Sequence, residues 1–176
     1  MEQEYTITAF SENSIGLLNR ITIIFTRRQV NIESLTVSQS SLPGIHKFTI
    51  VINATLEKVE KVTKQIEKLV EVLKAFYHTN EEIIQQEIAL YKVPTEALMG
   101  SQEIENLVRN SGARILEITP DYTVIEKTGY KSETQELFQK LDKYGVSQFT
   151  RSGTVAVTKS PKELLTEYLQ EMDRVN

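Results

Sequence analysis

The sequence predicts an α+β protein made of two successive β-α-β-β-α-β units followed by a C-terminal helix. Three observations favour this class: strand-like and helix-like periodicities alternate along the chain, polar turns separate them, and the same order of elements occurs twice. With 176 residues, 40% of them hydrophobic and 25% charged, the chain suits one compact domain or two small ones.

The first half alternates strand-like and helix-like segments. Leu17, Ile21 and Ile24 recur at helical spacing, and Pro43-Gly44 fits the middle of a type II turn between two strand-like runs. The apolar period after residue 55 continues to about residue 76, so its end is equally compatible with a helix or a strand, and we favour a strand. The expected elements are a strand over 5–10, a helix over 16–28, strands over 31–38 and 45–53, a helix from 55 and a strand from about 71, the order of ferredoxin-like domains.

The second half repeats this order without visible sequence identity to the first. A polar, acidic stretch over 79–85 is expected to be the linker. Ser152-Gly153 is expected to interrupt the last strand, as a bulge would. The expected elements are a strand over 87–92, a helix over 102–111, strands over 114–119 and 122–127, a helix opened by a capping box at 132–135 and stopped at Gly145, and a last strand over 146–158.

A further helix is expected at the C-terminal end. Ser160-Pro161-Lys162-Glu163 is typical of a helix start with proline at its first position. The apolar stripe of this helix could dock on its own domain or on a partner, and we favour its own domain; it consists of Leu164, Leu165, Tyr168, Leu169 and Met172. The predicted domains are therefore 1–79 and 86–176, the second including the terminal helix.

Composition excludes several classes of function. The net charge of −4 argues against a surface that follows nucleic-acid phosphates. Without cysteine there is no disulfide, thiolate nucleophile or cysteine metal site. No apolar run approaches the ~20 residues that a membrane helix needs. The acidic N-terminus shows no signal peptide, so the cytoplasm is the expected compartment.

No catalytic constellation is visible. The two histidines, His46 and His78, are far apart in the sequence and not at metal-binding spacing. The chain has no nucleophile elbow, P-loop or dinucleotide fingerprint. Glu33 lies in a strand-like run, where an outward-facing residue is the favoured interpretation. These absences indicate a binding module with no catalytic residue, no metal and no cofactor of its own.

The turn before the first helix is the most informative segment. Asn13 and Ser14 are good N-cap residues, so the first helical N–H groups are expected to face this turn, where they suit a carboxylate. Gly16 has no Cβ and would let a small ligand approach the backbone. The alternative from spacing alone, a helix cap with a tight packing contact, stays open and is the more common case.

Five strings of residues together resemble the regulatory small subunits of acetolactate (acetohydroxyacid) synthase. The string over 31–37, Asn-Ile-Glu-Ser-Leu-Thr-Val, is the most specific, and the resemblance extends to about residue 158. The other strings are Glu12-Asn13-x-x-Gly16-x-Leu18-x-Arg20, Glu87-Ile88-x-Leu90-Tyr91-Lys92-Val93, Ile115-x-x-Ile118-Thr119-Pro120 and Arg151-Ser152-Gly153. The resemblance also continues through the helix that ends with Leu69-Val70-Glu71-Val72-Leu73.

The resemblance implies an N-terminal ACT domain and a C-terminal ferredoxin-like domain in a homodimer. Such a dimer binds a catalytic large subunit that carries thiamine diphosphate, Mg and, as an open alternative, FAD. It raises the activity of that subunit and confers feedback inhibition by valine or a related branched-chain amino acid. Carried over by position, the effector would be held by Asn13, Ser14, Ile15, Gly16 and Leu17 of one chain and by Asn31 and Ile32 of the other.

The residue chemistry is compatible with this role. The Asn13 side-chain oxygen can accept a hydrogen bond from an ammonium group, and Ile15, Leu17 and Ile32 offer an apolar wall for a branched side chain. A missing methyl group in such a wall is worth only ~1–3 kcal/mol, so discrimination among valine, leucine and isoleucine is expected to be modest.

One departure and two alternatives stand beside the resemblance. Family members commonly have glycine where this chain has Gln29; if the position is left-handed, glutamine costs on the order of 1–2 kcal/mol. The first alternative is a stand-alone ACT-domain amino-acid sensor acting on another partner. The second is an enzyme with an unrecognised carboxylate site.

Overall fold

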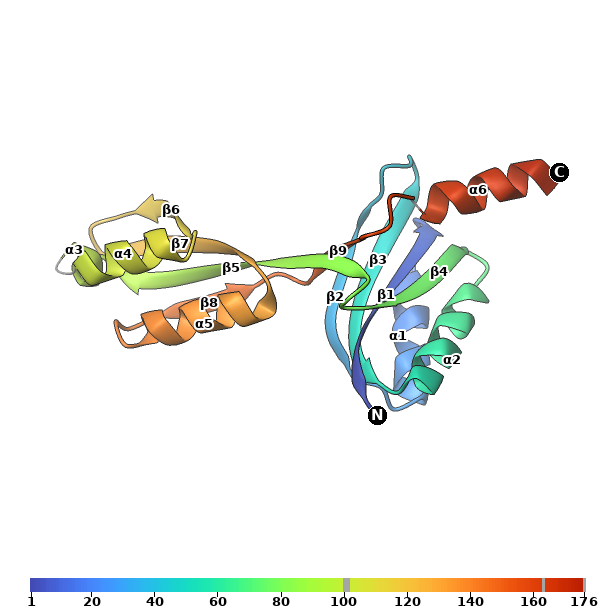
Figure 1. The fold of residues 1–176 in the computed structure, drawn as a ribbon, viewed down its shortest axis with the longest axis horizontal. Helices are drawn as coiled ribbons and strands as arrows, with labels where there is room; N and C mark the ends of the chain where they lie inside the picture. The colour runs from blue at the N-terminus through green and yellow to red at the C-terminus, as the bar shows by residue number, and fades with distance from the viewer. Residues whose placement is uncertain (100–101, 163, 176) are drawn as a thin grey trace. The chain divides into compact units, whose positions relative to one another are not determined.

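The computed structural model describes residues 1–99, 102–162 and 164–175. It divides into two compact units, one made of Met1–Ile84 with Thr154–Asn176 and the other of Gln85–Gly153 (Figure 1). The domain division at 79 and 86 stays a prediction. The units of the structure differ from it in one respect, because the segment after residue 153 packs with the N-terminal unit.

The first unit is a four-stranded antiparallel sheet with two helices. Its strands lie in the order β2-β3-β1-β4, the arrangement of ferredoxin-like domains. The elements are β1 (Gln3–Glu12), α1 (Leu17–Arg27), β2 (Ile32–Gln39), β3 (Ile45–Ala54), α2 (Leu56–Glu67) and β4 (Val72–Thr79). The predicted order of elements in the first half is confirmed, including the strand after residue 71.

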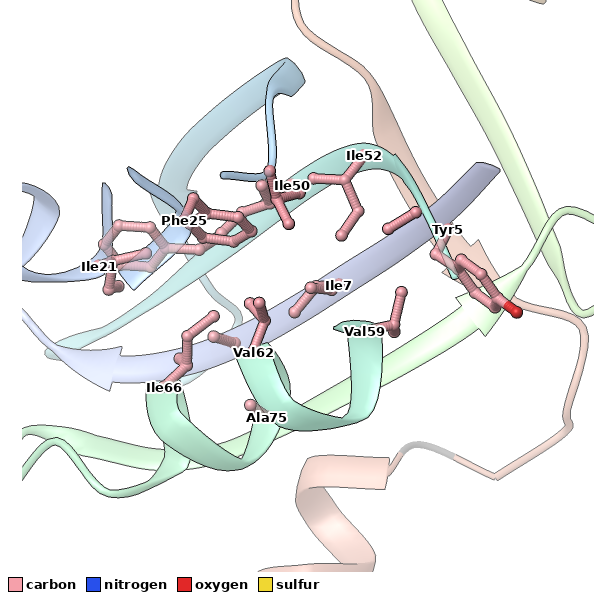
Figure 2. Packing of buried hydrophobic residues seen from close by; sticks show 14 of the residues in the cluster. Tyr5, Ile7, Ile21, Phe25, Ile50, Ile52, Val59, Val62, Ile66 and Ala75 are labelled. Carbon is pink, nitrogen blue, oxygen red and sulfur yellow. The ribbon is translucent and has the colours of Figure 1, made fainter. Parts of the chain in front are cut away.

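The core of this unit lies between the sheet and the two helices. Alternate residues of β1 face it, and Figure 2 shows Ile7 among Val59 and Val62 of α2 and Ile50 and Ile52 of β3. All five side chains are fully buried. Since burying a side chain of this size contributes about 1.5–3 kcal/mol, this packing is the main source of the unit's stability.

The hairpin and second helix form where the local sequence predicts them. Gly44 has φ 79°, and the Ile45 N–H donates to the Leu42 carbonyl at 3.1 Å, as in a type II turn. At the start of α2, the Thr55 hydroxyl accepts from the Lys58 N–H at 3.4 Å. Turn and cap chemistry therefore fix these boundaries.

The start of α1 corrects one expectation. The N-cap is Gly16, at φ 81°, and no side chain caps the helix; Asn13 and Ser14 were the predicted caps. The chain takes two further residues to turn from β1 into the helix axis, and the left-handed step falls on the residue that tolerates it best.

The C-terminal end of α1 is a Schellman motif. Gln29 has φ 54°; its N–H donates to the Thr26 carbonyl and the Val30 N–H donates to the Phe25 carbonyl, both at 3.1 Å. Phe25 and Val30 both lie in the core, which fixes the exit of the helix. Gln29 is therefore left-handed, which is the condition under which glutamine costs on the order of 1–2 kcal/mol.

Gln29→Gly is expected to stabilise the protein. It removes a strained Cβ at an exposed position, a gain of about 1 kcal/mol after the greater entropy of glycine in the unfolded chain is deducted. Differential scanning calorimetry should show Tm rising by about 2–4 °C. Gln29→Ala, which keeps the Cβ, is the matched control and should give no such rise. An equal rise in both variants would place the effect in the side chain instead of the backbone.

The second unit has the same fold. Its sheet order is β6-β7-β5-β8, with a core around Tyr91, Ile104, Ile125, Leu137 and Leu141. The elements are β5 (Ile83–Pro94), which begins in the first unit, α3 (Thr95–Met99), α4 (Gln102–Asn110), β6 (Arg114–Ile118), β7 (Tyr122–Gly129), α5 (Lys131–Asp142) and β8 (Gln148–Arg151). The α+β class with two ferredoxin-like units is confirmed.

Three details of the second half differ from the sequence-based expectations. The expected linker over 79–85 is a tight turn, in which the Glu82 N–H donates to the Thr79 carbonyl at 3.1 Å, because β5 already begins at Ile83. The capping carboxylate of α5 is Glu133, which accepts from the Tyr130 N–H at 2.7 Å, so the helix begins earlier than the predicted box. The short α3 was not expected.

The last strand of the prediction is two strands. β8 and β9 (Val155–Thr158) both pair with β5, and they belong to different units, so Ser152-Gly153 is a connection and not a bulge. α6 (Leu164–Val175) follows, and Glu163 of its expected cap lies outside the described residues. Leu165 is 2% exposed, and the Lys74 ammonium lies 5.6 Å from the centre of the Tyr168 ring, so α6 packs against the first unit.

Candidate functional site

The turn between β1 and α1 contains five of the predicted site residues. Asn13 and Gly16 are exposed, Ser14 is half-buried, and Ile15 is fully exposed. Leu17 is 1% exposed and belongs to the core, so only its main chain can reach a ligand. The structure thus brings these residues together, but only Ile15 presents an apolar side chain at the turn.

The backbone of this turn has unused donors. The Leu17 N–H makes only a long bond, 3.3 Å, to the Ser14 carbonyl. Within the described part of the chain, no acceptor is found for the N–H groups of Ile15, Gly16, Leu18 and Asn19. They lie at the positive end of the α1 dipole, where a carboxylate is stabilised. A Cβ built on Gly16 would meet no atom within 4 Å, so the turn is open to a ligand or a second molecule.

An ion pair fixes the base of the turn. The Arg20 guanidinium on α1 binds the Glu71 carboxylate just before β4, and the Glu71 carbonyl accepts from the Glu12 N–H at 2.9 Å. The hydrogen bond from Arg20 holds the pKa of Glu71 below its usual value. Arg20 is the last residue of one of the strings that carry the family resemblance, but the sequence alone suggested no role for it. The structure makes it a positioning residue that ties the first turn of α1 to the sheet.

The other two predicted residues lie at the opposite end of the same sheet. In the register of the strands, Ile32 is opposite Ile52, and Ile52 is opposite Tyr5 at the start of β1. The turn follows Glu12, seven positions further along β1, which at about 3.3 Å per residue is roughly 23 Å away. Asn31 and Ile32 therefore lie too far from the 13–17 turn of their own chain for one small ligand to contact both segments.

The described residues contain no group of three or more His, Asp or Glu side chains that could hold a metal ion. His46 and His78 lie on different strands of the first sheet, opposite Ser11 and Thr6 of β1 respectively. No helix within the described ranges is long and apolar enough to span a membrane.

A buried polar cluster in the second unit was missed by sequence reasoning. Glu87 on β5 is 5% exposed; its carboxylate accepts from the Thr134 hydroxyl of α5, and the Arg151 guanidinium of β8 lies 3.2 Å from it. The Tyr91 hydroxyl donates to the Thr134 carbonyl at 2.7 Å, and burial raises the pKa of Tyr91 to about 12. Both charged residues occur in the strings of the resemblance, which was the available signal. The cluster joins three elements of one core and is structural.

Comparison with known proteins gives the same family for both units. The family model "Small subunit of acetolactate synthase" matches residues 86–160, and "AHAS small subunit-like ACT domain" matches residues 7–74. The acetolactate synthase small subunit of Bacillus subtilis is 35% identical over 158 residues, covering 89% of this chain and 91% of that protein. The protein of the same name from Mycobacterium leprae is 33% identical, covering 92% and 95%.

A solved structure agrees with these sequence matches. The acetolactate synthase small subunit from Thermotoga maritima superposes with a TM-score of 0.82 at 29% identity, covering 91% of this chain and 99% of that one. The fold, both units and nearly the whole length therefore correspond. The chain belongs to the acetolactate synthase small subunit family.

Proposed function

We propose that the chain is the regulatory subunit that stimulates a thiamine-diphosphate-dependent catalytic subunit and confers feedback inhibition by valine or a related branched-chain amino acid. The effector lies between the 13–17 turn of one copy and Asn31 and Ile32 of a second copy. Thiamine diphosphate, Mg and FAD, where used, belong to the catalytic subunit, and the assembly works in the cytoplasm. Family membership supports the regulatory role.

The register of the first sheet is the observation that carries the shared site. β2 is an edge strand, and its end at Gln39 is level with Ser11, just before the turn, through His46 of β3. Antiparallel pairing of two β2 edges would place Ile32 of one copy beside Gln39 of the other. The 13–17 turn follows β1, which is two strands away from β2 in the sheet, so the turn lies about 10 Å from the Gln39 end of β2. A two-fold dimer would thus bring together the two halves that one chain keeps apart.

The turn supplies the groups that an amino acid needs. The unused N–H groups around Gly16 would bind its carboxylate, and the exposed Asn13 amide oxygen would accept from its ammonium. Ile15 and the half-buried Ile32 would contact the branched side chain. Because an extra methyl group in such a wall is worth about 1–3 kcal/mol, valine, leucine and isoleucine should differ by roughly 10–200-fold or less in affinity.

The proposed function is tested by reconstitution with the matching catalytic subunit. The purified chain alone should produce no acetolactate from pyruvate, whereas adding it to the catalytic subunit should raise kcat, and valine should then inhibit. An unrelated ACT-domain protein of similar size is the control for nonspecific stabilisation of the partner. Turnover by the chain alone would make it an enzyme. Amino-acid binding without stimulation would indicate a stand-alone sensor.

A further inference from the structure

A groove of about 740 Å³ runs between the two helices of the first unit. α1 and α2 lie side by side on one face of the sheet (Figure 1), and the Arg28 Nε at the end of α1 donates to the Gln65 Oε1 of α2 at 2.8 Å. The side chains that line the groove come from the C-terminal half of α1 and from the whole length of α2. The groove therefore belongs to the helix side of this unit alone.

The groove carries an excess of positive charge. Among the residues that the structure describes, its lining contains one carboxylate, Glu57, which is paired with Lys61 on α2. With five cations and one carboxylate, the lining has a net charge of +4, although the chain as a whole has a net charge of −4. The five cations are Arg27, Arg28, Lys58, Lys61 and Lys68.

Most of this charge is not compensated within the described part of the chain. The side chains of Arg27, Lys58 and Lys68 make no hydrogen bond or ion pair there. Arg28 is held by the neutral amide of Gln65, so its position is fixed while its charge stays available. Four cations of the groove can therefore interact with a bound anion.

Opposite charges are segregated on α2. Lys58, Lys61 and Lys68 recur at spacings of three and seven positions, which places them on one face of the helix. The other two carboxylates of α2 contact β4 instead. Glu60 accepts from the Tyr77 hydroxyl at 3.4 Å, and Glu67 is paired with Lys74; neither glutamate lines the groove. The helix thus presents its cations to the groove and uses these two carboxylates elsewhere.

Helix stability explains only part of this pattern. Arg27 in the last turn of α1 and Lys68 at the C-cap of α2 lie where the helix dipole stabilises a cation. Lys58 lies in the first turn of α2, where the dipole disfavours a cation, and no carboxylate within the described residues is paired with it. A cation at this position is accounted for by an anion that binds in the groove.

The spread of the charges indicates an extended anion. Lys58 and Lys68 are ten positions apart, which is about 15 Å along the helix axis, too far for the oxygens of one phosphate group to contact both. The lining also includes Ile24 and Leu69, which are half-buried and pack against the core. A protein segment that carries both carboxylates and apolar side chains matches this combination of spaced cations and apolar surface.

We propose that the groove between α1 and α2 docks an acidic, partly apolar segment of the catalytic subunit. This inference rests on the proposed function, which supplies the partner. Carboxylates of the segment pair with Arg27, Lys58 and Lys68, and its apolar side chains lie on Ile24 and Leu69. Because the chain as a whole is negative, a local basic groove attracts an acidic partner and sets its orientation during association.

The test measures binding of the full chain to the matching catalytic subunit by surface plasmon resonance at several salt concentrations. The double variant Lys58→Glu/Lys68→Glu should raise Kd about tenfold or more, chiefly by slowing association, and should make binding less dependent on salt. The matched control, Lys64→Glu/Lys131→Glu, changes the net charge equally at exposed lysines outside the groove. It should change Kd less than about twofold, since physiological salt screens charges beyond ~8 Å. An equal rise in both double variants, or no rise in either, would overturn the proposal.

A second pair of measurements separates folding and other ligands from docking. Thermal melts will show whether Lys58→Glu/Lys68→Glu folds. Lys58→Gln/Lys68→Gln removes the same charges without adding carboxylates and should raise Kd in the same direction by a smaller factor. If tripolyphosphate binds the unaltered chain but not this variant, while Kd for the catalytic subunit is unchanged, the groove is a phosphate site and the proposal is wrong.

Failure of this inference is distinguishable from failure of the proposed function. An unaltered chain that neither binds nor stimulates the catalytic subunit would overturn both. An unaltered chain that binds and stimulates, together with folded groove variants that keep its Kd and its salt dependence, would overturn only the docking groove.

Discussion

Gly16→Asp is expected to abolish feedback inhibition while the variant still stimulates the catalytic subunit. The N–H groups around Gly16 would bind the effector carboxylate, and a second carboxylate there adds like-charge repulsion in the same space. Within one chain the new side chain has room, since a Cβ at Gly16 meets no atom within 4 Å. The main loss should therefore appear in effector binding, with a smaller loss of stability because any side chain at φ 81° is strained. Inhibition curves with valine on the reconstituted enzyme measure it.

Gly16→Asn is the matched control. Asparagine has the shape of aspartate without its charge, and both tolerate the left-handed conformation of φ 81° better than other side chains. The two variants should therefore have similar Tm values, and the asparagine variant should retain weakened valine inhibition. If both lose inhibition equally, shape and not charge blocks the site. A normal valine curve with Gly16→Asp would show that the effector binds elsewhere.

Local chemistry predicted much of the first unit. Pro43-Gly44 specifies its turn because only glycine readily adopts the positive φ of the third residue, and Thr55 caps α2 through its own hydroxyl. The left-handed conformation at Gln29 follows from its position one residue past the C-cap of α1. These features depend on a few neighbouring residues, which the sequence displays directly.

Long-range pairing accounts for the features that the sequence did not predict. The segment around Ala156 continues the second half in sequence, yet it packs on the first unit, because its partners Ser34 and Lys47 are more than a hundred residues away. The pairing of Glu87 with Arg151 likewise depends on two strands meeting. The N-cap of α1 is Gly16 and not Asn13 or Ser14, which the sequence predicted. The path of the chain out of β1 sets where this helix begins, and not the capping strength of those two side chains.

The candidate site contains one feature that the sequence predicted and one that depends on long-range pairing. The resemblance named the 13–17 turn, and the structure shows unused donors there. That Asn31 lies at the far end of the sheet follows only from strand register, which no single segment encodes. This register makes a second copy of the chain necessary for any site that uses both segments.

The second large effect that we expect is the recovery of one effector site in a mixed dimer of two different mutant chains. A Gly16→Asp chain is paired with an Asn31→Ala chain, and each homodimer should bind valine poorly. In a shared arrangement, one site of the mixed dimer combines both lesions and the other combines two unaltered halves. Calorimetric titration of differently tagged, isolated mixed dimers should therefore count one tight site per dimer.

The control pairs a Gly16→Asp chain with an unaltered chain, which should also give one tight site, because only one of its two sites contains the new carboxylate. The mixed dimer of the two mutants should match it in affinity as well as in number, since its intact site has the same composition. A count of zero tight sites in the mixed dimer, with one in the control, would mean that the two lesions damage two different sites, one in each chain, and would rule out the shared pocket.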